Sequence, residues 1–424
     1  MKEFEQNGLK IIQTSLDNGL SVVLAQINKA PVVSINITFR VGSKDESPNH
    51  TGLAHLFEHL MFEGTKNLGK GEFDKYCSQA GGTNNAYTSY DQTTFYMTLP
   101  SNQLKLGLWL ESDRLFNHFI SKEALETQKK VVVEEISQTV EEQPYGMWRQ
   151  LLAQNAYSLN SCYSWEVQGL KEHVAKTLRR DINKFFKKFY SPSNACLVIC
   201  GDFQEMEALD LVNLYFGKKL ENQFALKRII LDEEQLTRGK EVTFNDDVPS
   251  SAVFQAYHCS GFKNLDVYKA EIISHILGSG RSSRLYKELV YKNQIAGQVG
   301  SFLDRREQDS LITIYAIGLN NEIEPLQLND AIRNVLELTL KNGFENDEII
   351  KTQNKLSTQL AREIQQLSGL ADNLAHFTLF NDSPQLIFEL QNLYSSFSLD
   401  EINDYAKKIL NYDDRICINA IPNK

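Results

Sequence analysis

The stretch TGLAHLFEHLMFEGT, residues 51–65, places two histidines and a glutamate within little more than one turn of otherwise apolar sequence. Its apolar side chains recur at the spacing of one helix face: Leu53, Leu56, Phe57 and Leu60. This periodicity predicts a helix. On that helix His55 and His59 are four residues apart and lie one above the other. Glu58, three residues after His55, points to the same side.

Two imidazoles on one helix face can bind a single zinc ion, each through a ring nitrogen at about 2.0–2.1 Å. The order H-x-x-E-H is the inverted form of the H-E-x-x-H zinc motif. It places Glu58 where a base for a zinc-activated water is needed. The alternative interpretation is a structural helix with two half-buried histidines and a surface glutamate. A third ligand on another element distinguishes the two.

A catalytic zinc site takes three protein ligands and keeps a fourth position open. The best candidates for the third ligand are Glu134 and Glu135, which follow a run of valines on a predicted helix. Neighbouring helix residues point about 100° apart, so only one of the two faces inward. Val131 and Val132 precede Glu135 by four and three positions, which favours Glu135 on the inner face. Glu134 stays possible on this pattern, and a solvated carboxylate is the structural alternative for either residue.

The composition is that of a globular protein with more than one domain. The chain has 424 residues, whereas single cores stop growing at roughly 250–300 residues. A formal net charge of −10 argues against a nucleic-acid-binding surface, which needs a basic face. The six cysteines lack the close spacing of a zinc site, so we expect reduced, buried thiols.

No apolar run approaches the ~20 residues of a membrane span. The N-terminal sequence MKEFEQNG has neither the apolar core of a signal peptide nor the Arg-rich character of a transit peptide. We therefore expect a cytoplasmic protein without a membrane partner.

Strand and helix signals follow one another through the first half of the chain. The turn Asp17-Asn18-Gly19 between two apolar runs predicts a hairpin. Further elements are predicted in chain order: a strand within 30–46, the histidine helix, a short helix ended by Gly81-Gly82, two strands within 83–100, helices at about 102–117 and 122–142, and a helix, a turn and a buried strand within 182–203.

The second half repeats this order. A strand and loop within 239–266 precede helices within 267–293, and a strand at 310–318 precedes a helix-rich segment at about 322–410 and a last strand at 415–421. We interpret this as two related α+β units joined near residues 218–232. The predicted domains are 1–222, which carries the histidine helix, and 223–424.

Four stretches now identify a resemblance: GLAHLFEHLMFEGT, GGTNNAYTSYDQTTFY, FFKKFYSPSNACLVICGDF and GSGRSSRLYKELVYKNQIA. They are similar to segments of the insulinase (pitrilysin) family of zinc metallopeptidases. The similarity spans essentially the whole chain and is to the short form that includes mitochondrial processing peptidase and its bacterial relatives.

The resemblance implies a role for each matching residue. In the family the third ligand follows the second histidine by about 76 residues, and 76 residues separate Glu135 from His59. The implied site is one Zn²⁺ per chain on His55, His59 and Glu135, with Glu58 as the catalytic base. Asn85 and Ala86 match positions that contact the bound peptide.

The family fold implies two homologous α/β-sandwich domains, each with an antiparallel-rich sheet packed with helices, in a clam-like pair of chains around a chamber. Peptides add a strand to a sheet edge near the zinc, which is tolerant of side chains. The implied function is a zinc endopeptidase acting on short or unfolded peptides. A zinc hydrolase of small amides would instead have a small closed pocket.

Two positions depart from the family pattern. Gln128 stands where relatives usually have a glutamate beside the site, and Gly297 stands where a tyrosine of an oxyanion-binding Arg/Tyr pair is common. Four arginines lie near Gly297 in the sequence: Arg281, Arg284, Arg305 and Arg306. We therefore hypothesise a zinc-bearing subunit of a heterodimer whose sister subunit supplies the Arg/Tyr pair. A self-sufficient homodimer and a non-catalytic scaffold subunit of the same family are the alternatives.

Overall fold

The computed structural model describes residues 1–6, 8–219 and 226–423. Its chain divides into two compact units that interleave along the sequence. The first unit contains Met1–Glu134, Val167–Ile229 and Gln359–Leu390, and the second contains Glu135–Glu166, Ile230–Thr358 and Gln391–Lys424. Each unit therefore includes a segment from the other half of the chain. The domain boundary predicted between residues 222 and 223 lies outside the described residues.

The first unit is built on a seven-stranded sheet with the order β1-β2-β3-β7-β4-β6-β5. Its strands are β1 (Lys2–Gln6), β2 (Leu9–Ser15), β3 (Ser21–Gln26), β4 (Val32–Phe39), β5 (Thr83–Thr88), β6 (Thr93–Pro100) and β7 (Ala195–Gly201). The predicted hairpin is confirmed, because β2 and β3 pair antiparallel on either side of residues 16–20. Only β3 and β7 pair in parallel among these strands. β5 ends the sheet and pairs with β6 alone.

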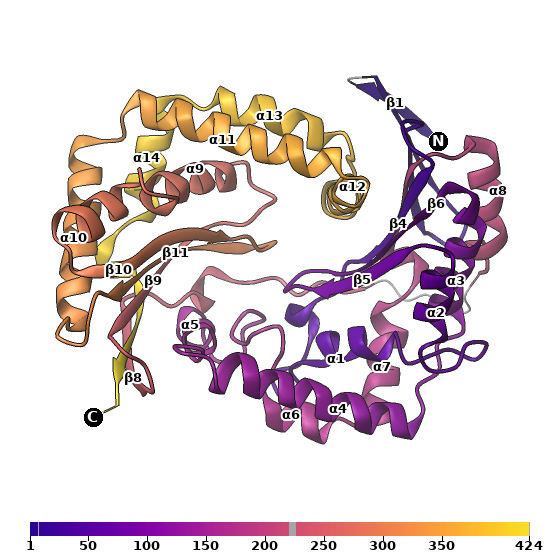
Figure 1. The fold of residues 1–424 in the computed structure, drawn as a ribbon, viewed down its shortest axis with the longest axis horizontal. Helices are drawn as coiled ribbons and strands as arrows, with labels where there is room; N and C mark the ends of the chain where they lie inside the picture. Colours follow the sequence, from indigo (N-terminus) through magenta and orange to yellow (C-terminus); the bar gives the residue numbers. More distant parts are fainter. Residues whose placement is uncertain (7, 220–225, 424) are drawn as a thin grey trace. The chain divides into compact units, whose positions relative to one another are not determined.

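Helices cover both faces of this sheet. They are α1 (Leu53–Leu60), α2 (Glu72–Gln79), α3 (Leu104–Phe116), α4 (Lys122–Ile136), α6 (Lys171–Lys176), α7 (Arg179–Phe189), α8 (Glu205–Phe216) and α12 (Leu367–Asn381). Ile35 of β4 lies against α3, whereas the neighbouring Asn36 donates to Asp372 of α12. Because side chains alternate along a strand, α3 and α12 lie on opposite faces (Figure 1).

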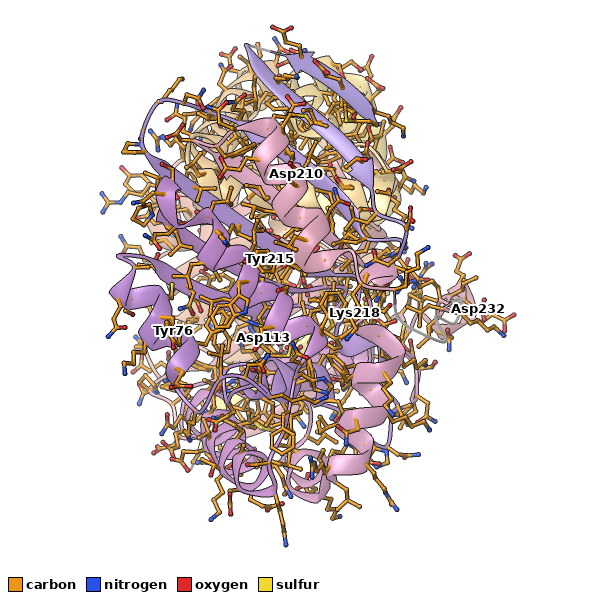
Figure 2. The ribbon with its side chains drawn as sticks, turned by 90° about the vertical axis from the view of Figure 1, so that its right-hand side faces the viewer. Tyr76, Asp113, Asp210, Tyr215, Lys218 and Asp232 are labelled. Atoms are coloured by element: carbon orange, nitrogen blue, oxygen red, sulfur yellow. The ribbon has the colours of Figure 1, made fainter. Side chains whose placement is uncertain are left out.

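The outer helices of the first unit form one layer with α3 in its middle. The ring of Tyr76 on α2 contacts Trp109 of α3, and Phe116 of α3 contacts Phe216 of α8. Figure 2 shows this side of the unit, with Asp113 of α3 beside Tyr76 of α2 and below Tyr215 of α8. This layer covers the face of the sheet on which Ile35, Met97 and Leu99 lie.

The second unit repeats this topology, as the sequence predicts. Its strands are β8 (Lys240–Asp246), β9 (Ala252–Ser260), β10 (Ala296–Asp304), β11 (Asp309–Gly318) and β12 (Ile416–Pro422). Their order, β10-β11-β9-β12-β8, matches β5-β6-β4-β7-β3 strand for strand, with the parallel pair again between the first and last strands in chain order. β10 thus occupies the edge that β5 occupies in the first unit.

The helices of the second unit include one from the first half of the chain. They are α5 (Trp148–Ala156), α9 (Asp266–Gly278), α10 (Pro325–Asn342) and α14 (Leu399–Ile409), while α11 (Asn346–Gln365) and α13 (Leu386–Ser396) each run from one unit into the other. α5 packs on β8, β9 and β12, and α12 packs on the equivalent β3, β4 and β7. Each sheet is thus covered by a helix from the opposite half of the sequence. This exchange was not predicted.

The cysteine prediction is confirmed: all six thiols are buried and none forms a disulfide. Within the described ranges, no helix combines the length and apolar character that crossing a bilayer requires.

Candidate metal centre

The helix α1 separates buried apolar residues from three half-buried polar ones. Its buried residues are Leu53, Ala54, Leu56, Phe57 and Leu60. The remaining positions are His55, Glu58 and His59, and each is half-buried. The rings of His55 and His59 lie edge to face with centroids 4.8 Å apart. The predicted helix and its inner face are therefore confirmed, and the polar residues share the one face that the core leaves open.

The start of α1 is fixed by a buried carboxylate that the sequence did not single out. Glu46, only 5% exposed, accepts hydrogen bonds from the backbone N–H groups of Gly52 at 2.8 Å and Ala54 at 2.7 Å. These groups belong to the first turn, where helix N–H donors lack partners within the helix. Gly52 itself has φ +85°, and a Cβ there would lie 2.5 Å from the carbonyl oxygen of Gln168. This position therefore requires glycine.

The loop that carries Glu46 is tied to the turn between β5 and β6. Lys44 and Asp91 form an ion pair at 2.7 Å with side chains 1% and 4% exposed. The backbone N–H of Lys44 also donates to the carbonyl of Tyr90 at 3.0 Å. The start of α1 and the end of β5 are therefore held by one buried connection.

The segment after α1 is held by α3. Asp113 of α3 accepts hydrogen bonds from the side chains of Thr65, Asn67 and Asn117. Asp113 is 2% exposed, so this carboxylate is buried among its donors. The start of α1 and the segment that follows it are therefore each held by a buried acidic residue.

The third candidate ligand, Glu135, stands in the last turn of α4. The division between the units falls between Glu134 and Glu135, so the preceding turns of the same helix belong to the first unit. Glu135 is half-buried and Glu134 is exposed. A π-helical segment, Ser137–Glu141, follows directly. Such segments are frequent at functional sites.

The reasoning that placed Val131 on the inner face was wrong, because Val131 is 44% exposed while Val132 is fully buried. The buried stripe of α4 runs along Leu125, Lys129, Val132 and Ile136. Glu135 precedes Ile136 and lies at the border of that stripe. This position accounts for the half-buried side chain of Glu135.

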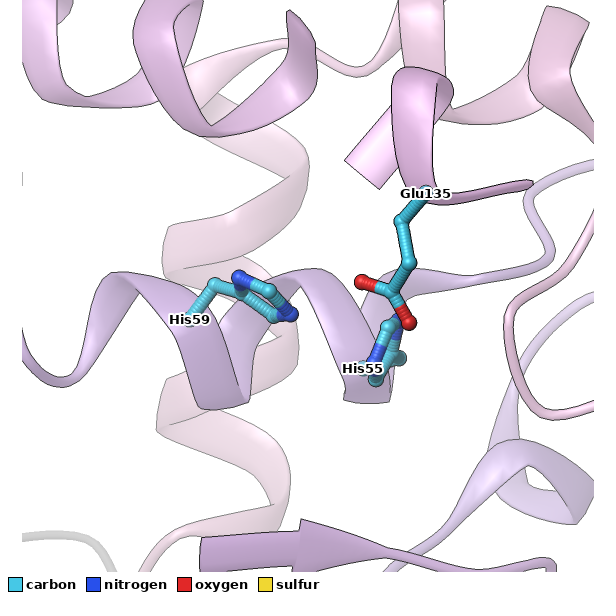
Figure 3. A group of neighbouring side chains, drawn as sticks. All are labelled: His55, His59 and Glu135. Atoms are coloured by element: carbon cyan, nitrogen blue, oxygen red, sulfur yellow. The ribbon is translucent and has the colours of Figure 1, made fainter. Parts of the chain in front are cut away.

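The structure brings His55, His59 and Glu135 together. One ligand atom from each of these residues lies within 4.8 Å of the others, and within the described ranges this is the group of histidine, cysteine and acidic side chains suited to a metal ion. Figure 3 shows the two imidazoles on one side of α1 and the carboxylate of Glu135 directed toward them.

The geometry and the chemistry of these donors fit Zn²⁺. Two imidazole nitrogens and one carboxylate oxygen form a common catalytic zinc set, which leaves one position open. Ligand atoms at ~2.1 Å around a tetrahedral ion lie about 3.4 Å apart, so adjustments of about an ångström would bring the three groups to bonding distance.

Glu58 is oriented by the sheet. The hydroxyl of Thr88, the last residue of β5, donates to Glu58 Oε2 at 2.5 Å. Sequence reasoning missed Thr88, although it stands in the stretch whose resemblance was noted. Asn85 and Ala86 lie on the same edge strand, with Asn85 exposed and Ala86 half-buried. The side-chain oxygen of Asn85 accepts the N–H of Ala86 at 2.9 Å.

Gln128 belongs to a separate polar contact on α4. Its Nε2 donates to Glu63 Oε1 at 2.6 Å, and Glu63 also pairs with Lys70 at 3.1 Å. Gln128 Oε1 is buried without a hydrogen-bond partner in the described part of the chain. The neutral amide of Gln128 therefore donates to the carboxylate of Glu63.

Three of the four arginines named from the sequence have structural partners within the second unit. Arg284 binds both oxygens of Glu348, Arg305 binds Glu271, and Arg306 pairs with Asp304 at 2.6 Å. Arg281 is exposed. Gly297 lies exposed on β10, the edge strand of its sheet.

Comparison with family models matches both parts of the chain. The model described as "Insulinase (Peptidase family M16)" matches residues 21–164, and the one described as "Peptidase M16 inactive domain" matches residues 177–356. The first range contains the candidate metal centre.

Curated relatives align along nearly the whole chain. "Zinc protease PqqE" of Helicobacter pylori is 28% identical over 400 residues, which cover 93% of this chain and 89% of the relative. "Uncharacterized zinc protease YmxG" of Bacillus subtilis is 24% identical, with 93% and 95% covered. "Probable mitochondrial-processing peptidase subunit beta, mitochondrial" of Arabidopsis thaliana is 23% identical, with 96% and 77% covered.

Solved structures share the fold. A protease from Helicobacter pylori superposes with a TM-score of 0.91 at 26% identity, covering 98% of this chain and all of the other. A protein described as a peptidase M16 inactive domain from Pseudomonas fluorescens has a TM-score of 0.88 at 15% identity and covers 98% of both chains, which shows the fold alone. Because the two family models together span most of the sequence, this chain belongs to the insulinase family, peptidase family M16.

Proposed function

We propose that this protein is a zinc-dependent endopeptidase that hydrolyses short or unfolded peptides. The observation that carries the proposal is the convergence of His55, His59 and Glu135 beside Glu58, which shares the open face of α1. The names of the relatives, several of them zinc proteases, support the same chemistry.

In the proposed mechanism His55, His59 and Glu135 hold the metal. Bound Zn²⁺ supplies Lewis acidity, which polarises a carbonyl group and acidifies water. Glu58 accepts a proton from the attacking water and passes it to the nitrogen of the leaving amine. The hydrogen bond from Thr88 fixes the Glu58 carboxylate while it performs both transfers.

The edge strand β5 is the proposed peptide-binding element. β5 pairs with β6 alone, so its outer N–H and C=O groups are available to an added strand. Asn85 and Ala86 lie on this strand, and Thr88 connects its end to Glu58. A peptide bound along β5 through its backbone would be recognised with little dependence on its side chains. This low specificity suits unfolded substrates.

The departures at Gln128 and Gly297 support the proposal of a heterodimer. Gly297 offers no hydroxyl to a substrate carbonyl, and Arg284, Arg305 and Arg306 are each committed to a carboxylate of their own unit. We propose that a sister subunit of the family supplies the Arg/Tyr pair. The same two positions favour the second candidate function, a non-catalytic scaffold subunit.

Metal analysis and peptidase assays test the proposal together. Wild type, Glu58→Gln and the control Glu123→Gln, an exposed position on α4, are measured for zinc content and for cleavage of a quenched peptide library. Each is measured alone and with a co-encoded sister chain. Zinc in all three and a ~10²–10⁴-fold loss of cleavage only in Glu58→Gln are expected.

Cleavage that requires the sister chain would support the split site. Full cleavage by the chain alone would overturn the heterodimer. Absence of zinc in wild type would overturn the peptidase and leave the scaffold.

A further inference from the structure

A basic pocket lies within the second unit, apart from the metal centre. It is an open depression of about 280 Å³ between the end of α9, the loop that follows it and one face of α11, with Lys351 and Lys355 at its exposed rim. The loop provides Ser279, Gly280, Ser282 and Ser283. α11 provides Lys351 and Lys355, which are four residues apart and share one helix face.

The two lysines have hydroxyl partners instead of carboxylate partners. Lys355 Nζ donates to Ser279 Oγ at 2.6 Å, and Lys351 Nζ donates to Ser282 Oγ. Neither ammonium group forms an ion pair within 4.0 Å in the described part of the chain. Two like charges on adjacent turns repel each other, so this arrangement favours binding of a negative charge between them.

The acidic residue in the pocket wall is already neutralised. Glu348 binds Arg284 through both oxygens and accepts a hydrogen bond from the backbone N–H of Glu345 at 3.0 Å. Although burial opposes ionisation, the hydrogen bonds from Arg284 and Glu345 hold the pKa of Glu348 below its ordinary value. The net local charge is positive in a chain whose formal charge is −10.

The pocket also offers neutral donors to an anion. Because Ser279 and Ser282 accept from lysines, their own O–H groups are available to donate, and each ammonium group keeps two further N–H donors. His275 Nδ1, in the pocket wall, is buried without a hydrogen-bond partner in the described ranges. Gly280 has φ +82°, and a Cβ built there meets nothing within 4 Å, so the loop leaves space for a ligand.

We propose that this pocket binds a phosphoryl group, either free phosphate or the phosphate of a small metabolite. A tetrahedral oxyanion matches the number of donors: two ammonium groups and the hydroxyls of the loop between them. The two ammonium groups at the pocket disfavour a cation. The proposal does not depend on zinc or on peptidase activity, since every lining residue belongs to the second unit.

Binding of inorganic phosphate and of pyrophosphate to the full chain tests this proposal. Isothermal titration and ³¹P line broadening are measured for wild type and for the double variant Lys351→Gln/Lys355→Gln. The matched control is Lys240→Gln/Lys341→Gln, which removes the same charge at two exposed positions of the same unit. A peptide with a free C-terminal carboxylate serves as the competing anion.

Saturable phosphate binding that weakens about 10-fold or more in the pocket variant and stays within twofold in the control is expected, because charge-assisted hydrogen bonds are lost. Tighter binding of pyrophosphate than of phosphate would show that the pocket accepts a ligand larger than one phosphoryl group, and equal binding would show that one phosphoryl group fills it. Equal weakening in both double variants would overturn the proposal, because it would show attraction by overall charge. Tighter binding of the carboxylate peptide than of either phosphate would overturn it as well.

Discussion

Replacing Glu46 by glutamine should loosen the start of α1 and weaken metal binding without touching a ligand. The Glu46 carboxylate accepts the N–H groups of Gly52 and Ala54 at 2.8 and 2.7 Å in a buried position. Glutamine keeps one acceptor oxygen and presents an NH₂ group to the other N–H. One buried backbone donor then faces another donor.

The magnitude follows from these two contacts. Hydrogen bonds to a charged group contribute roughly 1.5–3 kcal/mol, and a buried donor left without a partner costs about 1–3 kcal/mol. Loss of negative charge at a helix N-terminus costs a further ~0.3–1 kcal/mol. Relief from burying a charge offsets part of this sum. We therefore expect Glu46→Gln to lower the free energy of unfolding by about 2–3 kcal/mol.

Three measurements on the Glu46→Gln variant separate its consequences. Urea unfolding of metal-free protein gives the stability change, with Glu5→Gln, an exposed position on β1, as the control. Amide exchange should accelerate at Gly52 and Ala54 before other sites of the unit. Competition with a chelator should show zinc affinity reduced by about 10-fold or more, because His55 follows directly on the loosened turn.

A stability change below ~0.5 kcal/mol, the range of ordinary surface substitutions, would refute the capping role of Glu46. Lower stability with unchanged zinc affinity would refute the link between this cap and the position of His55. Both results are independent of catalytic activity.

Three further changes have defined outcomes. Gln128→Glu places a carboxylate against Glu63 Oε1, now 2.6 Å from the amide nitrogen. One of the two pKa values should then rise in the folded state, so the variant should be about 1–2 kcal/mol less stable at pH 7 and should recover toward pH 5 in urea titrations. Burial against Phe186, with help from nearby lysines, lowers the pKa of His118 from 6.5 to about 4. On acidification the unfolded chain therefore takes up a proton at His118 before the folded chain does. The free energy of unfolding of wild type should fall by ~2 kcal/mol between pH 7 and pH 5, and the His118→Gln variant should not show this loss. At Gly297 a built Cβ meets nothing closer than 3.8 Å, so Gly297→Tyr should change stability by less than ~0.5 kcal/mol in thermal unfolding.

The elements predicted from local periodicity agree with the structure because their signals are local. Apolar spacing placed α1 and its inner face, and the turn around Asn18 placed the hairpin of β2 and β3. The repeated order of elements predicted the matching topology of the two sheets. Strand β10 received no prediction, because its glycines and polar residues obscure the alternation that marks a strand.

The exchange of α5 and α12 has no local signal. α12 is buried or half-buried on every side except at Asn381, and the residues of α5 and α12 do not indicate which sheet each helix covers. Asp372 of α12 accepts the hydroxyl of Tyr87 at 2.7 Å across 285 residues of sequence. Such contacts depend on the complete fold, so they cannot be predicted from a single sequence.

The same limit divides the candidate metal centre into two parts. Its two histidines and Glu58 lie within five consecutive residues, where helix geometry alone aligns them. For Glu135 the only local signal was the neighbouring run of valines. Three consecutive valines carry no periodicity, so Val131 was assigned to the inner face of the helix although it is exposed. Glu46 and Thr88 act through contacts across 8 and 30 residues that no spacing rule describes. The residues that carry the chemistry of this site can therefore be predicted from the sequence, whereas the contacts that hold them in place can be identified only from the fold.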